Sequence, residues 1–105
     1  MSNHHLCPKF ESAFELLGKR WTGLIIHVLQ EGPKRFKDIS SVIPGMSDRM
    51  LTERFKELEA AGIIHRHVYP ETPVRIEYEL SEKGKALEPV MAEVQKWAET
   101  WVKGC

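Results

Sequence analysis

The spacing of apolar side chains along this chain changes from a helical period to strict alternation, and returns to a helical period near the end. Before residue 62 they recur three or four positions apart, as on one face of an amphipathic helix. In residues 74–80 apolar and charged residues alternate, as in a half-buried strand. Residues 64–69 are predicted to form a second strand, with residues 70–73 as the tip of a hairpin. We therefore expect a mainly α-helical chain with one small β-hairpin.

Helix boundary signals place four helices before the hairpin and one after it. Pro8 suits a first helical turn, because its missing N–H would be unpaired there anyway. Ser47 and Ser81 are candidate N-caps, and Gly62 is a candidate helix stop. Pro89 lies inside the last expected helix and allows a kink or a break there. The expected helices cover residues 8–17, 20–30, 35–42, 48–61 and 82–102.

Two of these helices are separated by a tight turn, and the hairpin follows them directly. Pro44 and Gly45 form the turn between the short helix at 35–42 and the amphipathic helix at 48–61. A short helix, a tight turn and an amphipathic helix are the signature of a helix-turn-helix, and the hairpin would be its wing. At 105 residues the chain fits one domain, residues 1–105. The expected fold class is a winged helix-turn-helix.

The charge of the chain is segregated along the sequence. The formal net charge is zero, which by itself argues weakly against nucleic acid as a partner. Between residues 34 and 56, however, six Lys or Arg stand against three acidic residues, whereas the last expected helix is mildly acidic. A basic face can dock on phosphates while the rest of the surface stays neutral. Double-stranded DNA is therefore the expected partner.

The helix at 48–61 is the expected recognition helix, because Leu51, Phe55 and Leu58 would anchor one face to the core. Its opposite face carries Arg49, which can pair with guanine, and Lys56, which suits a phosphate. A merely solvated face is the alternative interpretation. The candidate DNA contacts, including those on the wing, are Lys34, Arg35, Lys37, Ser47, Asp48, Arg49, Thr52, Lys56, Arg66 and Arg75.

The two arginines of the hairpin are open to two interpretations. Arg66 and Arg75 could enter the minor groove or touch a phosphate, as wing residues do. They could equally be surface charges, for example in a cross-strand pair between Arg66 and Glu77. The sequence favours neither interpretation.

The first and last expected helices carry more large apolar side chains than one small core can readily cover. Trp97 and Trp101 are four residues apart and therefore share a helix face. Small cores are marginal alone, and aromatic residues are enriched at interfaces. We expect a homodimer, which implies a near-palindromic operator with half-sites about 34 Å apart; core packing is the alternative. The expected interface comprises Phe10, Phe14, Leu17, Met91, Val94, Trp97 and Trp101.

Several short motifs together resemble one family of regulators. The chain carries CPK at 7–9, LGKRW at 17–21, GPKRF at 32–36, MLTER at 50–54 and YELSEKG at 78–84. Over nearly its whole length it resembles the HxlR-type regulators, and in particular their thiol-sensing branch. The resemblance implies dimeric repressors with the first and last helices at the interface. It also implies that a cysteine just before the first helix, here Cys7, senses quinones or other electrophiles such as diamide.

The position of Cys7 agrees with that role. The dipole at a helix N-terminus favours negative charge, and the thiolate is the form that reacts with electrophiles. His4, His5 and Lys9 add positive character nearby. An inert, half-buried thiol is the alternative interpretation.

A second cysteine is implied near the end of the last helix, but this sequence departs from that pattern. Val102 stands at the expected position, and Cys105 lies just beyond it. Cys7 and Cys105 are the candidate redox-sensing residues. The outcome of oxidation stays open between an adduct on Cys7 and an intersubunit Cys7–Cys105 disulfide.

Other function classes find less support in the sequence. His4, His5 and Cys7 could form a metal cluster, and His65 and His67 a second pair, but neither has the spacing of a closed zinc site. We therefore expect no metal and no cofactor. A winged helix used only for protein–protein contact would lack the salt-dependent DNA affinity that phosphate contacts produce.

Catalysis and membrane insertion are not expected. The sequence holds no phosphate-binding glycine loop, no nucleophile elbow and no His-Glu zinc helix. The first residues lack the basic and apolar regions of a signal peptide, and no apolar run approaches the roughly 20 residues of a membrane span. The protein is expected to be a non-enzymatic regulator of the cytoplasm.

Overall fold

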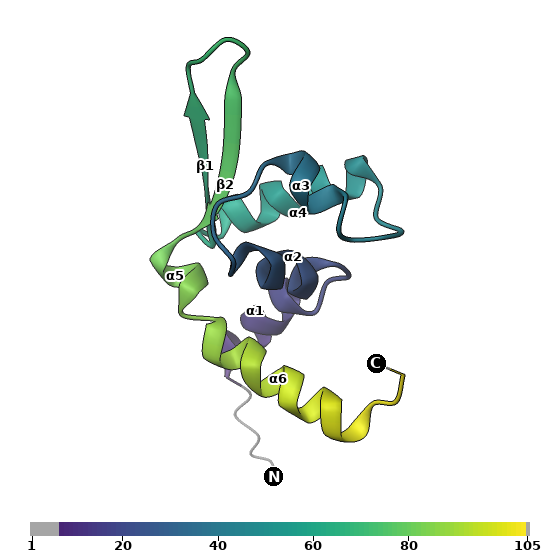
Figure 1. Cartoon of the computed structure of the whole chain (residues 1–105). Coiled ribbons are helices and arrows are strands. Elements are labelled where there is room, and N and C mark those ends of the chain that lie inside the picture. Colours follow the sequence, from purple (N-terminus) through teal and green to yellow (C-terminus); the bar gives the residue numbers. More distant parts are fainter. Residues whose placement is uncertain (1–6, 105) are drawn as a thin grey trace.

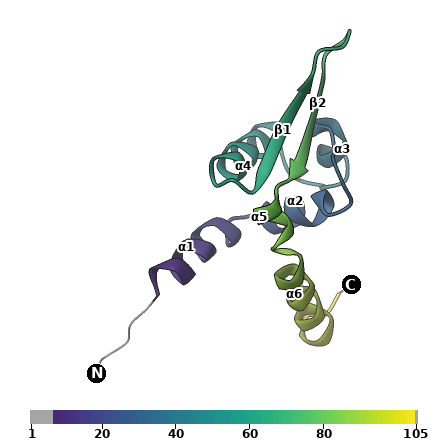
Figure 2. The ribbon, with the colours of Figure 1, turned by 90° about the vertical axis from the view of Figure 1, so that its left-hand side faces the viewer.

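The computed structural model describes residues 7–104. A central body of three helices carries the hairpin on one side, and the terminal helices leave it on the other (Figures 1 and 2). The two terminal helices diverge from each other, as the rotated view shows. The elements are α1 (Pro8–Leu17), α2 (Thr22–Leu29), α3 (Phe36–Ser40), α4 (Asp48–Ala60), β1 (Ile64–Tyr69), β2 (Arg75–Leu80), α5 (Glu82–Lys85) and α6 (Glu88–Trp101).

The core lies between α2, α3, α4 and the base of the hairpin. Leu51 and Leu58 are fully buried and Phe55 nearly so, which confirms them as the anchors of α4. The ring of Phe55 stacks on Tyr78 of β2 with 4.1 Å between centroids, and this contact fixes the hairpin against α4. The other fully buried large apolar side chains of the described residues are Ile25, Ile26, Leu29, Ile39 and Ile64.

Both predicted N-caps are confirmed. The hydroxyl oxygen of Ser47 accepts the backbone N–H of Met50 at 3.1 Å, so α4 begins at Asp48 as expected. The hydroxyl of Ser81 accepts the N–H of Gly84 at 3.1 Å and itself donates to the carbonyl of Gly62 at 2.6 Å. Ser81 therefore joins the start of α5 to the end of α4.

The hairpin is antiparallel and is held by a third segment. Its register runs from Ile64 opposite Leu80 to Tyr69 opposite Arg75. Lys34, just before α3, exchanges two backbone hydrogen bonds with Tyr78, at 2.9 and 2.7 Å. The wing is thus attached to the helix-turn-helix through backbone bonds as well as through the aromatic stack.

The break that Pro89 allowed in the last expected helix is present: this segment forms two helices, α5 and α6, and Pro89 occupies the first turn of α6. Three other expected boundaries were wrong. The second helix begins at Thr22 rather than at residue 20, because Trp21 has a left-handed backbone with φ of 78°. The short third helix spans only Phe36–Ser40, and β2 begins at Arg75.

Two glycines give a matched test of this packing. An added Cβ at Gly84 would lie well inside van der Waals contact with the carbonyl oxygen of Ile63 and 3.0 Å from Leu80. Gly84→Ala should therefore lower the free energy of unfolding by about 1–3 kcal/mol. At Gly23, in α2, an added Cβ meets nothing within 4 Å. Gly23→Ala should instead raise the free energy of unfolding by about 0.5–1 kcal/mol, because alanine has a higher helix propensity than glycine.

Urea denaturation at one fixed protein concentration measures both glycine variants. A Gly84→Ala variant as stable as wild type would contradict the close packing of α5 on the α4–β1 turn.

Candidate nucleic-acid interface and thiol site

The exposed face of α4 meets the base of the wing. Leu51, Phe55 and Leu58 point into the core, so the side chains of Arg49, Thr52 and Lys56 are left exposed on the other side. A groove of about 420 Å³ lies between α4 and the hairpin, lined among others by Thr52, Lys56 and Arg66. The structure therefore brings three predicted contacts from two elements to one groove.

The ion pairs divide the predicted basic contacts into two groups. Lys34 Nζ lies 2.9 Å from a carboxylate oxygen of Glu31, and Arg75 is paired with two glutamates. Within residues 7–104, the remaining predicted cations form no ion pair. An unpaired cation can approach a phosphate without first losing a carboxylate. The unpaired group comprises Arg35, Lys37, Arg49, Lys56 and Arg66.

Arg75 is held within the wing. Its guanidinium lies 3.9 Å from the ring centroid of Tyr69 and donates to Glu71 at 2.8 Å and to Glu77 at 2.6 Å. Hydrogen bonds first to Glu71 and then to Glu77 raise the pKa of Arg75, and the bond from Arg75 lowers the pKa of Glu71. The alternative pair of Arg66 with Glu77 was wrong, because the register places Arg66 opposite Tyr78.

The hydroxyls of the expected interface already bond to the backbone. Ser47 caps α4, and Thr52 donates to the carbonyl of Asp48 at 2.8 Å. Both oxygens keep free lone pairs, and the exposed N-terminus of α4 offers the positive end of a helix dipole. This end of the helix can accept an anionic group.

The terminal helices expose most of the expected interface. Neither α1 nor α6 contains a buried residue, and Phe14, Trp97 and Trp101 are 60%, 61% and 71% exposed. Leu17 and Met91 differ from the rest, because both are partly buried against the core of the same chain. The exposed members are Phe10, Phe14, Val94, Trp97 and Trp101.

Cys7 is the N-cap residue of α1. Its thiol is free and exposed, and its carbonyl accepts the N–H of Glu11 at 3.2 Å. No side chain caps this helix end, so the thiol lies at an uncapped helix N-terminus, which is the positive end of the helix dipole. His4, His5 and Cys105 lie outside the described residues.

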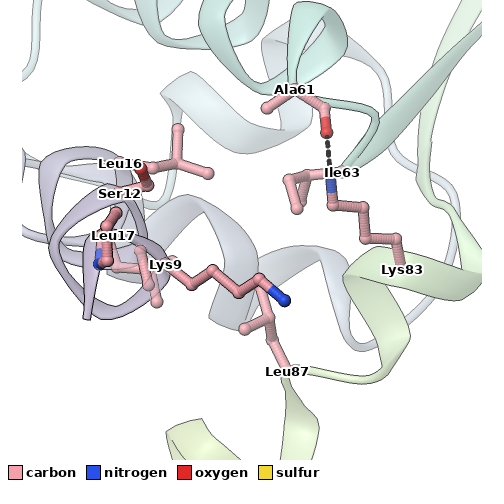
Figure 3. A pocket seen from close by; sticks show the side chains of 10 residues that line it. Lys9, Ser12, Leu16, Leu17, Ala61, Ile63, Lys83 and Leu87 are labelled. Atoms are coloured by element: carbon pink, nitrogen blue, oxygen red, sulfur yellow. Dashed lines mark hydrogen bonds between the residues drawn. The ribbon is translucent and has the colours of Figure 1, made fainter.

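A large cavity separates α1 from the body of the protein. It has a volume of about 750 Å³ and lies between α1, the α4–β1 turn and α5 (Figure 3). Leu16, Ile63 and Leu87 line it, and Lys9 extends into it from α1. Lys83, opposite, donates to the carbonyl of Ala61 at 2.7 Å. Packing beneath α1 is therefore incomplete in the described part of one chain.

Sequence reasoning missed a charged cluster on the far side of α4. Lys19 and Arg54 both bond to the carboxylate of Glu57, at 2.9 and 3.1 Å. Arg54 and Glu57 are three residues apart, so their pairing was visible in the sequence. The partner Lys19 was not, because it is 38 residues away from Glu57.

The histidines within residues 7–104 form no metal cluster. His67 Nε2 lies 2.9 Å from a carboxylate oxygen of Glu79, and His27 is exposed. Among residues 7–104, no group of three or more His, Cys, Asp or Glu side chains could hold a metal ion. In the same residues, no helix combines the length and the apolar character that crossing a membrane requires.

Comparison with protein families gives a match over most of the chain. Residues 16–104 match the family described as the HxlR-like helix-turn-helix. The matched region contains α2, α3, α4, the hairpin, α5 and α6.

Individual relatives also match over most of the chain. The chain is 62% identical over 94 residues to the HTH-type transcriptional regulator YodB of Bacillus subtilis, covering 90% of this chain and 84% of the relative. The structure of the quinone-bound YodB matches with a TM-score of 0.81 and 55% identity, over 91% of this chain and 100% of that chain. The diamide-treated YodB matches with a TM-score of 0.80 and 58% identity, over 96% and 100% of the two chains.

Proposed function

The chain belongs to the HxlR-like helix-turn-helix family, and on that premise we propose that it is a homodimeric DNA-binding repressor, released from its operator when Cys7 is modified. The observation that carries the proposal is the set of unpaired cations on α3, α4 and β1. A surface that keeps its cations free beside an exposed recognition helix is suited to a polyanion. The protein acts in the cytoplasm, without catalytic chemistry.

In this proposal α4 enters the major groove of DNA. Arg49, in the first turn of α4, reaches a guanine edge, since the N-terminal residues of a recognition helix contact bases. Lys56 and Arg66 hold a phosphate in the groove between α4 and the wing. Arg35 and Lys37 contact the backbone from α3 and fix the register without reading sequence.

The exposed apolar faces of α1 and α6 form the interface of the proposed dimer. Side chains as large as Trp97 and Trp101 are costly to leave in water and are the kind that anchors interfaces. A two-fold axis between these helices places two copies of α4 on one face of DNA. The operator is then near-palindromic, with half-sites about 34 Å apart.

The proposed switch is covalent chemistry at Cys7. The thiolate sulfur adds to a ring carbon of a quinone, so a C–S bond forms as the ring C=C π bond breaks, and one ring oxygen takes a proton from water. The attacked carbon then loses its hydrogen as a proton while the second oxygen gains one, which yields a hydroquinone thioether. The bulky group then sits at the start of α1, beside the proposed interface. Quinone-bound and diamide-treated forms of the relative YodB support electrophiles of these two kinds as effectors. The altered packing of α1 changes the spacing of the two recognition helices.

Arginine and lysine substitutions test the DNA interface by fluorescence anisotropy. Arg49→Ala should cost about 1–3 kcal/mol of binding free energy and relax specificity at one base. Lys56→Ala should weaken binding to all DNA sequences alike. It should also reduce the slope of the logarithm of the binding constant against the logarithm of the salt concentration by about one. Arg75→Ala, which removes a cation already paired with two glutamates, should change affinity less than either.

DNA from upstream of the gene serves as the probe in this titration, and Lys85→Ala on α5 is the control. Affinity that does not depend on salt would contradict the interface and favour a protein-interaction module.

Substitution of an exposed tryptophan tests the dimer. Trp97→Glu places a charge in the proposed interface and should raise the monomer–dimer dissociation constant by roughly 30-fold or more. Val68→Glu changes a side chain that is 50% exposed on the wing, away from α6. This variant should leave the monomer–dimer dissociation constant unchanged. Sedimentation velocity over a concentration series measures both. Equal effects of the two substitutions would argue against α6 as the interface.

Cys7→Ser tests the switch. The variant should bind DNA like wild type in its reduced state, since the hydroxyl is nearly isosteric with the thiol, and should not be released by a quinone or by diamide. Cys105→Ser, treated in parallel, distinguishes an adduct on Cys7 from a disulfide between the two cysteines. Release of the Cys7→Ser variant by quinone would defeat the proposed sensor.

A further inference from the structure

The turn between α1 and α2 is the junction through which α1 meets the rest of the protein. The cavity beneath α1 leaves its N-terminal part with few partners on that side, while its C-terminal end packs against α2. Residues 18–21 follow directly and contain the left-handed Trp21. A displacement of α1 therefore reaches the body through this turn, in addition to the partial packing of Leu16 and Leu17 against the core.

A charged cluster fastens this turn to α4. Lys19 Nζ lies 2.9 Å from Oε2 of Glu57, and Arg54 Nη1 lies 3.1 Å from Oε1 of the same carboxylate. Arg54 Nε also donates to the backbone carbonyl of Arg20 at 2.9 Å. The three side chains of Lys19, Arg54 and Glu57 are called the Glu57 bracket below. Glu57 thus binds a side chain of the turn, that of Lys19, and Arg54 binds its backbone at the carbonyl of Arg20.

The Arg54–Glu57 pair of the bracket is more sheltered than an ordinary surface ion pair. The side chain of Arg54 is 15% exposed and that of Glu57 is 29% exposed, whereas that of Lys19 is 43% exposed. The hydrogen bond from Lys19, with the charges of Arg54 and Lys19, lowers the pKa of Glu57 despite the opposing effect of burial. The carboxylate therefore stays ionised at neutral pH, and the forked guanidinium of Arg54 fixes its orientation.

A second contact joins the same turn to the other end of the recognition helix. A Cβ added at Gly45 would lie 3.6 Å from Cη2 of Trp21, so the indole packs against the turn that precedes α4. The guanidinium of Arg20 stacks 4.4 Å from the indole centroid. Trp21 has a φ of 78°, which is costly for a bulky residue and is maintained only where the surroundings over-determine it. Residues 19–21 thus touch α4 at its middle and just before its start.

We propose that the Glu57 bracket is the link by which a change at Cys7 on α1 repositions α4. The proposal rests on the proposed function for its consequence at DNA, but not for the link itself. Arg54 and Glu57 belong to the same helix as Arg49 and Lys56, and a helix of 13 residues moves as a rigid body. Because α1 buries no residue, apolar packing alone offers a weak link between it and α4. Lys19, Arg54 and Glu57 are positioning residues here, since none touches the thiol or the proposed DNA contacts.

Hydrogen exchange after alkylation tests the link without DNA. In a Cys105→Ser background, N-ethylmaleimide modifies Cys7: the sulfur adds to the maleimide double bond, and the adjacent carbon takes a proton from water. Alkylation should change backbone amide exchange in residues 19–21 and in α4 by about 2- to 30-fold. With Glu57→Gln or Lys19→Met, the change should remain in the turn and be largely lost from α4. Lys85→Met, an exposed lysine on α5 outside any described ion pair, should behave like the parent.

Arg54→Lys distinguishes the effect of the forked guanidinium group of Arg54 from the effect of its positive charge. A lysine keeps the charge but cannot bond to Glu57 and to the carbonyl of Arg20 together, so α4 should again lose its response. A merely structural role would change exchange in the unmodified protein instead, and the same variants before alkylation measure that. An α4 response in Glu57→Gln equal to that of the parent would overturn the proposal, as would no response of α4 in the parent.

The DNA arm of the experiment tests the proposed function separately. If alkylation alters α4 in the parent while DNA stays bound, the bracket is a link but the protein is not released by this chemistry. If DNA is released from Glu57→Gln as readily as from the parent, the signal reaches α4 by another route and the bracket is not the link.

Discussion

Burial of one face of α4 is the constraint on which the rest of the structure depends. Leu51, Phe55 and Leu58 occupy the centre of the core, so the opposite face of the same helix must be exposed. The stack of Phe55 on Tyr78 then sets where the wing stands relative to that face. The groove that holds Lys56 and Arg66 follows from this one packing arrangement.

The ion pairs divide the arginines into those that hold parts of the structure together and those proposed to contact DNA. Arg54 and Arg75 are both locked by glutamates, the first between α4 and the α1–α2 turn and the second inside the wing. Arg49, by contrast, stands exposed on the free face of α4. A zero net charge is compatible with a polyanionic partner, because within residues 7–104 the carboxylates pair with Arg54 and Arg75 and not with the proposed contacts Arg49, Lys56 and Arg66.

The terminal helices are only partly packed against the rest of the chain. Most of their large apolar residues are exposed, and a cavity lies under α1. The positions of α1 and α6 therefore depend on what covers these residues. A thiol at the start of such a helix is well placed to change how it packs, since little internal packing resists a displacement there. The Glu57 bracket connects the α1–α2 turn to α4 by polar contacts, where α1 itself makes few apolar ones.

The sequence by itself determined the features that depend on neighbours within a few residues. Helical and alternating periods located the elements, and the side chains of Ser47 and Ser81 marked two helix starts. The tertiary structure decided what depends on distant segments. Lys19 meets Glu57 across 38 residues, and the strand register places Arg66 opposite Tyr78 rather than opposite Glu77. Local signals act through bonds between adjacent turns, whereas these partners are set only when packing of the whole core fixes each element against the others.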